Sequence, residues 1–168
     1  LIYHKNNKII LTFPGVPTEL KDMWNSTAKN YLQKLNPLTS VIKSRILRFV
    51  GESESTLAEK VSDFLNNNNP TVAPLAGKGE VVLRVTAKAG DNLSAEALIA
   101  PVEKEIISRF EKFYYGADED TLTSVTLKLL QDRNETLAVA ETFTGGLISE
   151  RLLSHEGADQ FMIFGVIS

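Results

Sequence analysis

A stretch of nine residues, from 138 to 146, constrains the fold of this chain more than any other part of the sequence. It reads Ala-Val-Ala-Glu-Thr-Phe-Thr-Gly-Gly, an apolar run that ends in a glutamate, two threonines and two glycines. A helical pattern of apolar side chains follows at once, from Leu147 to Leu153. The stretch therefore predicts a strand that enters a helix through a loop rich in hydroxyls and glycine. The first amides of such a helix lack partners within the helix and attract anions.

The end of the chain continues this alternation of strands and helices. Residues 161–167 read Phe-Met-Ile-Phe-Gly-Val-Ile, an apolar run that is typical of a buried parallel strand. Before the loop, Asp118 is the expected N-cap of a helix that includes Leu122 and Leu130, and a strand at 137–140 follows. This order predicts an α/β fold with a parallel, three-layer sheet, of which two strands are present.

The middle of the chain predicts a different arrangement, a small α+β sandwich of split-βαβ type. Its elements follow the order β-α-β-β-α-β over about residues 43–116, after a short linker at 38–43. They are a strand at 45–50, a helix capped by Ser53 that carries Leu57, Val61, Phe64 and Leu65, a strand at 71–76, a turn at Gly77-Lys78-Gly79, an alternating strand at 81–88, a helix that carries Leu98, Val102, Ile106 and Phe110, and a strand at 113–115.

The beginning of the chain predicts a strand, a tight turn and a helix. The strand covers residues 8–13, and the turn is Pro14-Gly15-Val16-Pro17, whose second proline suits the first turn of a helix. Asn36-Pro37 is the expected end of that helix. Because the chain starts without Met and ends on an apolar strand, we expect it to be a piece cut from a longer protein.

Composition excludes several classes of function. The net charge of -3 and the pI near 5.5 disfavour a protein that binds nucleic acid by neutralising phosphates. The chain has no cysteine, which excludes disulfides and thiolate metal sites and fits a cytoplasmic protein. No apolar run approaches the roughly 18 residues of a membrane span, so we expect no membrane contact.

Isolated histidines and aromatic residues are assigned structural roles. His4 and His155 match no metal-ligand spacing and are expected to be solvated, and no metal site is predicted. The aromatic residues on apolar stripes are expected to lie in the core; these are Trp24, Phe49, Phe64 and Phe110.

Four motifs together resemble the CinA family, in the order in which that family has them. They are Pro14-Gly-Val-Pro-Thr-Glu-Leu20, Gly51-Glu-Ser-Glu54, Ala73-Pro-Leu-Ala-Gly-Lys-Gly-Glu-Val-Val-Leu-Arg84 and Ala140-Glu-Thr-Phe-Thr-Gly-Gly146. The resemblance implies three parts: 1–37, the end of a molybdopterin-binding-like domain; 38–117, a KH-like connector; and 118–168, the start of a nicotinamide-nucleotide amidohydrolase domain.

The resemblance also implies what the full-length protein does. Its C-terminal domain would deamidate nicotinamide mononucleotide to nicotinate mononucleotide and ammonia, and its N-terminal domain would cleave the pyrophosphate of ADP-ribose, where a divalent metal is an option. We expect a small-molecule nucleotide substrate and a homodimer in the full-length form. Two alternatives stay open, a non-catalytic connector and dimerisation module, and a KH-like RNA-binding module.

The candidate site residues come from the motifs. Thr142 stands at the serine position of the Glu-Ser-x-Thr-Gly-Gly motif of the family and is the candidate catalytic residue. Ala158 and Asp159 follow Gly157 where the family has a later Gly-Ser-Ser. Glu141, Thr144, Gly145 and Gly146 are the expected substrate-binding residues. For the hydroxyls and glycines, helix capping and close packing remain the alternative. For Glu141, the alternative is that its carboxylate orients the loop by bonding backbone amides.

The remaining expectations concern the other two parts. Gly15 and Val16 are candidate contacts for a phosphate in the full-length protein. Gly77-Lys78-Gly79 is read as a hairpin turn, because KH domains bind RNA through a Gly-x-x-Gly loop with basic flanks, and this segment lacks both that spacing and those flanks. The family's lysine and tyrosine belong just past Ser168, so we expect no turnover from these 168 residues alone.

Overall fold

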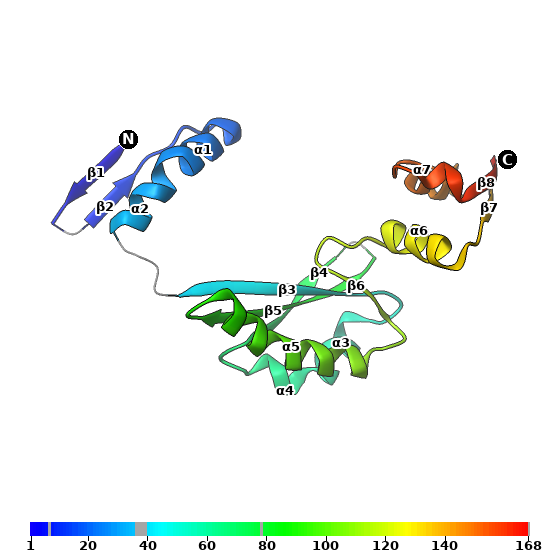
Figure 1. Cartoon of the computed structure of the whole chain (residues 1–168), viewed down its shortest axis with the longest axis horizontal. Coiled ribbons are helices and arrows are strands. Elements are labelled where there is room, and N and C mark those ends of the chain that lie inside the picture. The colour runs from blue at the N-terminus through cyan, green and yellow to red at the C-terminus, as the bar shows by residue number, and fades with distance from the viewer. Residues whose placement is uncertain (7, 36–39, 78, 168) are drawn as a thin grey trace. The chain divides into compact units, whose positions relative to one another are not determined.

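The computed structural model describes residues 1–6, 8–35, 40–77 and 79–167 (Figure 1). The chain divides into two compact units, Leu1–Val41 and Ile42–Ser168. The expected mixture of helices and strands, and with it the α/β class, is confirmed. No helix in the described ranges has both the length and the apolar character that crossing a membrane requires.

The first unit is a β-hairpin followed by a helical segment. Strand β1 (Ile2–Lys5) pairs antiparallel with β2 (Lys8–Leu11). The sequence predicted β2 but missed β1. Asn6, which has a φ of 50°, was the signal of a turn before β2 and hence of a preceding strand. The helical segment consists of α1 (Pro17–Met23), the π-helical turn η1 (Trp24–Ala28) and α2 (Lys29–Leu35). Pro17 is the first helical residue, as predicted, and the expected helix end at Asn36-Pro37 lies outside the described residues.

The apolar stripe of this helical segment is not a core. Ala28 is buried, but the Trp24 side chain is 41% exposed, so its assignment to the core was wrong. The physical reason is that a single hairpin covers little of the helix surface. Phe13 supplies the aromatic contact to Trp24, with ring centroids 6.3 Å apart.

The second unit begins with the complete βαββαβ arrangement that the sequence predicts. The strands are β3 (Val41–Phe49), β4 (Thr71–Ala76), β5 (Val81–Ala89) and β6 (Tyr114–Ala117), and the helices are α3 (Glu54–Lys60), α4 (Ser62–Leu65) and α5 (Asn92–Arg109). The sheet order is β4-β5-β3-β6, with β4 antiparallel to β5 and β3 antiparallel to β6. In Figure 1 the three helices lie on one face of this sheet. The strand at Val41 replaces the second half of the expected linker at 38–43.

The core of this sandwich lies between the sheet and its helices. Phe49 and Phe110 are fully buried and pack edge to face, with ring centroids 5.4 Å apart. The predicted alternation in β5 is confirmed for Val81, Leu83, Val85 and Ala87, which are buried, and for Arg84 and Lys88, which are exposed. Val82 was expected on the exposed face but is buried as well. In α5 the buried stripe runs through Ala95, Ile99 and Ile106, and Leu98 lies beside it, partly exposed. Phe64 is half-buried beneath the Arg109 guanidinium, 4.7 Å from the ring centroid, so its assignment to the core was wrong.

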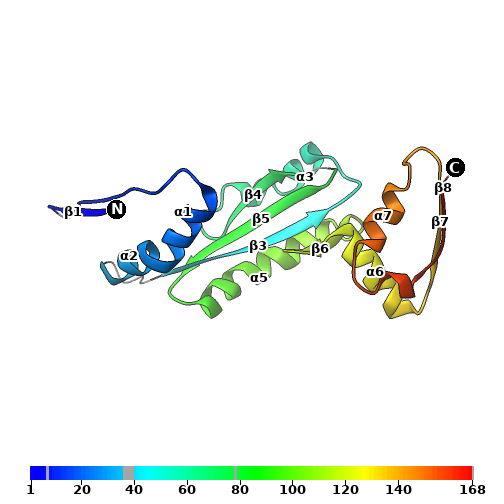
Figure 2. The same cartoon turned by 90° about the horizontal axis from the view of Figure 1, so that it is seen from above.

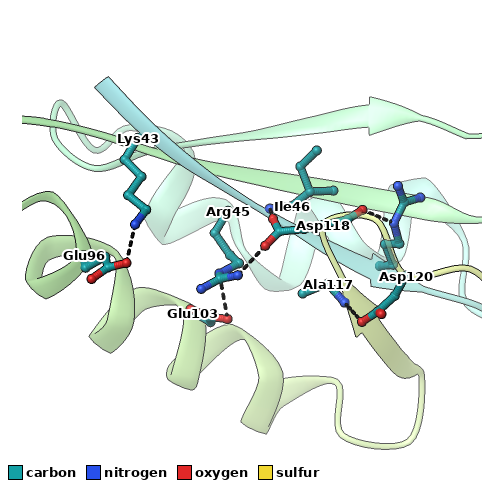
Figure 3. A network of polar contacts seen from close by, with 9 residues as sticks. Lys43, Arg45, Ile46, Glu96, Glu103, Ala117, Asp118 and Asp120 are labelled. Carbon is teal, nitrogen blue, oxygen red and sulfur yellow. Dashed lines mark hydrogen bonds and ion pairs between the residues drawn. The ribbon is translucent and has the colours of Figure 1, made fainter. Parts of the chain in front are cut away.

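Asp118, just beyond β6, ties the end of the sandwich to β3 (Figure 3). Its carboxylate accepts hydrogen bonds from the amide of Ile46, at 2.9 Å, and from the guanidinium of Arg45. Its backbone carbonyl accepts a hydrogen bond from Arg48 Nε at 2.8 Å, and its amide donates to the Ile46 carbonyl at 2.8 Å. The prediction that Asp118 caps the next helix was therefore wrong.

Thr121 is the residue that caps the next helix, α6 (Leu122–Arg133). The Thr121 hydroxyl accepts from the amide of Ser124 at 3.0 Å, and the Ser124 hydroxyl accepts from the amide of Thr121 at 2.9 Å. Such a reciprocal capping box satisfies two helix amides that otherwise lack partners. Asp118 lies three positions before this observed cap, and it was mistaken for the cap because both residues carry side-chain oxygens.

The last part of the chain builds one edge of a parallel sheet. Strand β7 (Leu137–Glu141) pairs parallel with β8 (Met162–Ile167), and between them lie α7 (Leu147–Leu153) and the short 3-10 helix η2 (Ala158–Gln160). Leu127 of α6, Leu152 of α7 and Ala158 form its small buried core. Figure 2 shows α6 and α7 on the same side of the two strands. Ala138, Ala140 and the β8 residues from Ile163 to Ile167 are exposed.

Replacement of Asp118 should destabilise the sandwich. Asp118→Ala removes two side-chain hydrogen bonds and places alanine at a φ of 51°, so we expect a loss of about 2 kcal/mol in the free energy of unfolding. Asp118→Asn, which keeps an acceptor and tolerates this backbone conformation, should lose about half as much. The measurement is urea unfolding at neutral pH. The control is Glu119→Ala, at the neighbouring exposed carboxylate, whose free energy of unfolding should stay within about 0.5 kcal/mol of that of the wild type. A loss equal to that of Asp118→Ala would contradict the stabilising role of the Asp118 hydrogen bonds.

Candidate functional site

The loop after β7 is organised by one buried carboxylate, that of Glu141. Glu141 is the last residue of β7 and is only 3% exposed. Its two oxygens accept four hydrogen bonds: Oε2 from Thr144 Oγ1 at 2.5 Å and the Ile148 amide at 2.9 Å, and Oε1 from Ser149 Oγ at 2.6 Å and the Ser149 amide at 2.9 Å. An ionised carboxylate offers about four lone-pair positions, so Glu141 is saturated by the protein itself.

The reason for this arrangement is the start of helix α7. Gly146 occupies its N-cap position and has no side chain with which to accept a hydrogen bond. The amides of Ile148 and Ser149, in the first turn, would otherwise lack partners. Glu141 accepts both, so a residue at the end of the preceding strand serves as the cap of the helix. The alternative in which Glu141 orients the loop through backbone amides describes this geometry.

The hydrogen bonds also set the charge of Glu141. Burial on its own would raise the pKa of this carboxyl group. The hydroxyls of Ser149 and Thr144 and the amides of Ile148 and Ser149 bond the charged form and outweigh burial, so they lower the pKa to about 2. Glu141 is therefore an anion at neutral pH, and it is not a proton donor in this site.

The anion expected at this helix start is thus supplied from within the chain. Since Glu141 already bonds two first-turn amides, the expectation that these amides capture a ligand anion needs correction. The physical cause is local: the strand, the tight loop and the helix bring the carboxylate within reach of the amides seven and eight residues later. A ligand at this loop meets hydroxyls and glycine backbone instead.

The two glycines give the loop its sharp turn. Gly145 and Gly146 have φ angles of 61° and 92°, in the left-handed region that favours glycine. A Cβ on Gly145 would enter open space, whereas a Cβ on Gly146 would lie 2.5 Å from Ile167 Cδ1. Gly145 is exposed and Gly146 is buried beneath β8. Both precede α7 in a turn, as the sequence predicts, but only Gly145 is open to a ligand.

The candidate hydroxyls lie on the exposed side of this loop. Thr142 and Thr144 are both exposed, and between them the Phe143 side chain is 100% exposed. Within the described part of the chain, the Thr142 hydroxyl forms no hydrogen bond, whereas the Thr144 hydroxyl is bonded to Glu141. The structure therefore brings Glu141, Thr144, Gly145 and Gly146 together with Thr142 at the carboxyl end of β7.

Gly15 and Val16 lie in the first unit, in an exposed turn. Val16 is the N-cap of α1, and its carbonyl accepts the amide of Leu20 at 3.0 Å. A Cβ on Gly15 would meet nothing within 4 Å, so the turn does not depend on glycine for space. This segment is an ordinary proline-bounded helix start, and it stays only a predicted phosphate contact.

Asp159, His155 and His4 differ in their exposure to solvent. Asp159 is exposed on η2, beside the buried Ala158. His155 is half-buried, so the expectation of a solvated side chain was wrong; its Nδ1 atom is buried and has no partner among the residues described. His4 is exposed, and its Nδ1 lies 3.2 Å from the Tyr31 hydroxyl.

Sequence reasoning missed Ser149, which contributes both its amide and its hydroxyl to Glu141. The signal was present as a hydroxyl residue three positions after the N-cap glycine, on the face of the helix that returns to the strand. Across the described ranges, no cluster of three or more His, Asp or Glu side chains could hold a metal ion.

Comparison with known proteins matches the chain to two family models. Residues 44–116 match the model described as "Damage-inducible protein CinA KH domain", and residues 119–168 match the "CinA C-terminal domain". Curated relatives named "CinA-like protein" include those of Nostoc sp. (strain PCC 7120 / SAG 25.82 / UTEX 2576), 51% identical over 96% of this chain, and Synechocystis sp. (strain ATCC 27184 / PCC 6803 / Kazusa), 46% identical over 100% of it. The matches span 38% and 41% of those two relatives, which agrees with the expectation of a piece of a longer protein.

Glu141 should give the chain an acid-dependent stability. Since its pKa in the folded protein is about 2 and that of an unfolded glutamate is about 4.3, its contribution is full above about pH 5 and is lost as pH falls toward 2. The free energy of unfolding of Glu141→Gln should therefore lie below that of the wild type at pH 7, and the gap should narrow at pH 3. Denaturant unfolding at both pH values tests this. The control is Glu150→Gln, at an exposed position of α7. If the difference in free energy of unfolding between wild type and Glu141→Gln were the same at pH 7 and pH 3, the lowered pKa of Glu141 would be contradicted.

The two glycines should respond differently to alanine. Gly145→Ala places a Cβ in open space at a φ that L residues visit, so we expect a loss of about 1 kcal/mol in stability. Gly146→Ala combines a less accessible φ with a contact to Ile167, and should cost about 2 kcal/mol or more. Thermal unfolding of the two variants gives the comparison. Equal losses of stability would mean that the contact between the new Cβ at position 146 and Ile167 of β8 does not destabilise the protein.

Proposed function

Because this chain belongs to the CinA family, we propose that the full-length protein hydrolyses the carboxamide of nicotinamide mononucleotide to nicotinate mononucleotide and ammonia. The observation that carries the proposal is the loop 142–146, held in a fixed turn at the carboxyl end of a parallel strand by the buried Glu141. Ligands of open α/β sheets bind at this edge. The motif and the geometry of this loop support the proposed reaction.

In this proposal, Thr142 supplies the attacking oxygen. Its hydroxyl lies on the exposed loop, without a partner in the described ranges, so it is free to approach a carbonyl carbon. Attack would form a carbon–oxygen bond, and collapse of the tetrahedral intermediate would break the carbon–nitrogen bond and release ammonia. Water would then hydrolyse the ester. A base is needed to take the hydroxyl proton, and Glu141 is unsuited because all of its acceptor positions are occupied.

The rest of the chain supports this site in the full-length protein. We assign residues 1–37 to the end of the molybdopterin-binding-like domain, 38–117 to the KH-like connector, and 118–168 to the start of the amidohydrolase domain. The N-terminal domain would cleave ADP-ribose, with Gly15 and Val16 near its phosphates.

A second function rests on the sandwich of β3–β6. It is a complete four-stranded unit with its own core, and Asp118 ties its exit segment to β3. These features suit a connector that positions two catalytic domains and contributes to a homodimer. An RNA-binding role has less support, because β4 and β5 pair up to Ala76 and Val81, and the residues between these two lack the Gly-x-x-Gly spacing of RNA-binding KH loops.

The experiment is ammonia release from nicotinamide mononucleotide by the full-length protein. Thr142→Ala should lower the rate by at least about 100-fold, as expected for loss of a nucleophile, whereas Thr142→Ser should retain activity because the attacking hydroxyl remains. Thr126→Ala, an exposed threonine of α6, is the matched control and should leave the rate unchanged. Full activity in Thr142→Ala would remove Thr142 from the mechanism. No release by the wild type would favour the connector.

A further inference from the structure

We propose that the Thr144 hydroxyl accepts a hydrogen bond from the NH₂ group of the substrate's carboxamide. The site would therefore prefer the amide substrate to the carboxylate product. The inference rests on the proposed function and assigns a specificity-determining residue to it. It follows from the direction of one hydrogen bond, that between Thr144 Oγ1 and Glu141 Oε2, which are 2.5 Å apart.

The direction of this bond is fixed by the chemistry of its partners. A threonine hydroxyl has one proton and two lone pairs, and an ionised carboxylate has only lone pairs. Glu141 is ionised at neutral pH, since its pKa is about 2. Thr144 must therefore donate its only proton to Glu141. The Ser149 hydroxyl, 2.6 Å from Oε1, is oriented in the same way.

A ligand at the loop consequently meets Thr144 as an acceptor. Thr144 is exposed, and its lone pairs are the hydrogen-bonding capacity that remains. If the hydroxyl turned to donate to a ligand, Glu141 would lose a hydrogen bond inside a buried site, which is costly. Glu141 thus acts as a positioning residue that determines the polarity of Thr144.

This polarity separates the two ends of the proposed reaction. A carboxamide carries an NH₂ group with two donors, whereas a carboxylate at neutral pH carries acceptors only. The product would place lone pairs against the lone pairs of Thr144 and a negative charge near Glu141. The same reasoning places a nucleotide phosphate elsewhere, because a phosphate dianion also lacks donors.

The test compares the binding of the amide and the acid by the full-length protein. Titration calorimetry with nicotinamide mononucleotide and nicotinate mononucleotide, in a Thr142→Ala background to prevent turnover, should show about tenfold tighter binding of the amide. Thr144→Val, which replaces the hydroxyl with a methyl group of similar size, should abolish the preference. Thr144→Ser should keep it, which guards against a general effect of substitution. Glu141→Gln should weaken it, because the glutamine amide can donate to Thr144 and release the threonine proton.

The outcomes separate this inference from the proposed function. Amide preference without ammonia release from the unsubstituted protein would support the role of Thr144 and remove the proposed reaction. Ammonia release with an unchanged preference in a folded Thr144→Val protein would overturn the role of Thr144 and leave the reaction standing. The role of Thr144 would also be overturned if a protein with Thr144 intact bound the two ligands equally, or if it bound neither of them.

Discussion

The buried carboxylate of Glu141 is the interaction on which the rest of this site depends. A helix of seven residues is too short to be stable by itself, and α7 begins at a glycine that offers no cap. Glu141 supplies that cap and at the same time holds the Thr144 hydroxyl. Strand, loop and helix are therefore joined through one side chain, and the exposed loop residues inherit a defined geometry from a residue that no ligand needs to touch.

The same device occurs at the end of the βαββαβ sandwich. Asp118 accepts the amide of Ile46, in β3, and the guanidinium of Arg45, just as Glu141 accepts amides across its loop. In both cases an acidic side chain meets backbone donors at the point where the chain leaves a sheet. Charged acceptors are suited to this task, because hydrogen bonds to an ionised group are roughly twice as strong as those between neutral groups. Irregular segments beside the sheets are fixed in this way without large hydrophobic contacts.

The sequence predicts regular elements of this chain well and polar tertiary contacts poorly. The alternation in β5, the strands on either side of the loop, and the βαββαβ order follow from periodicity and turn residues, which are local properties. Asp118 shows the limit. Its neighbours in sequence indicate a helix cap, and only the fold shows that its carboxylate bonds a residue 72 positions earlier. Trp24 shows a second limit, because a stripe becomes a core only when other surface covers it.

The loop illustrates how a correctly predicted turn can hold an interaction that the sequence does not indicate. The glycines and hydroxyls at a helix start indicate a site for anions, and the geometry does contain an anion, but it is the protein's own carboxylate. An internal anion has a consequence that an external one lacks. It is present before a ligand arrives, so it orients the Thr144 hydroxyl in advance, and Thr144 presents only its lone pairs to the ligand. Discrimination between an amide and an acid then requires no movement of the backbone, because the proton that decides it is already committed.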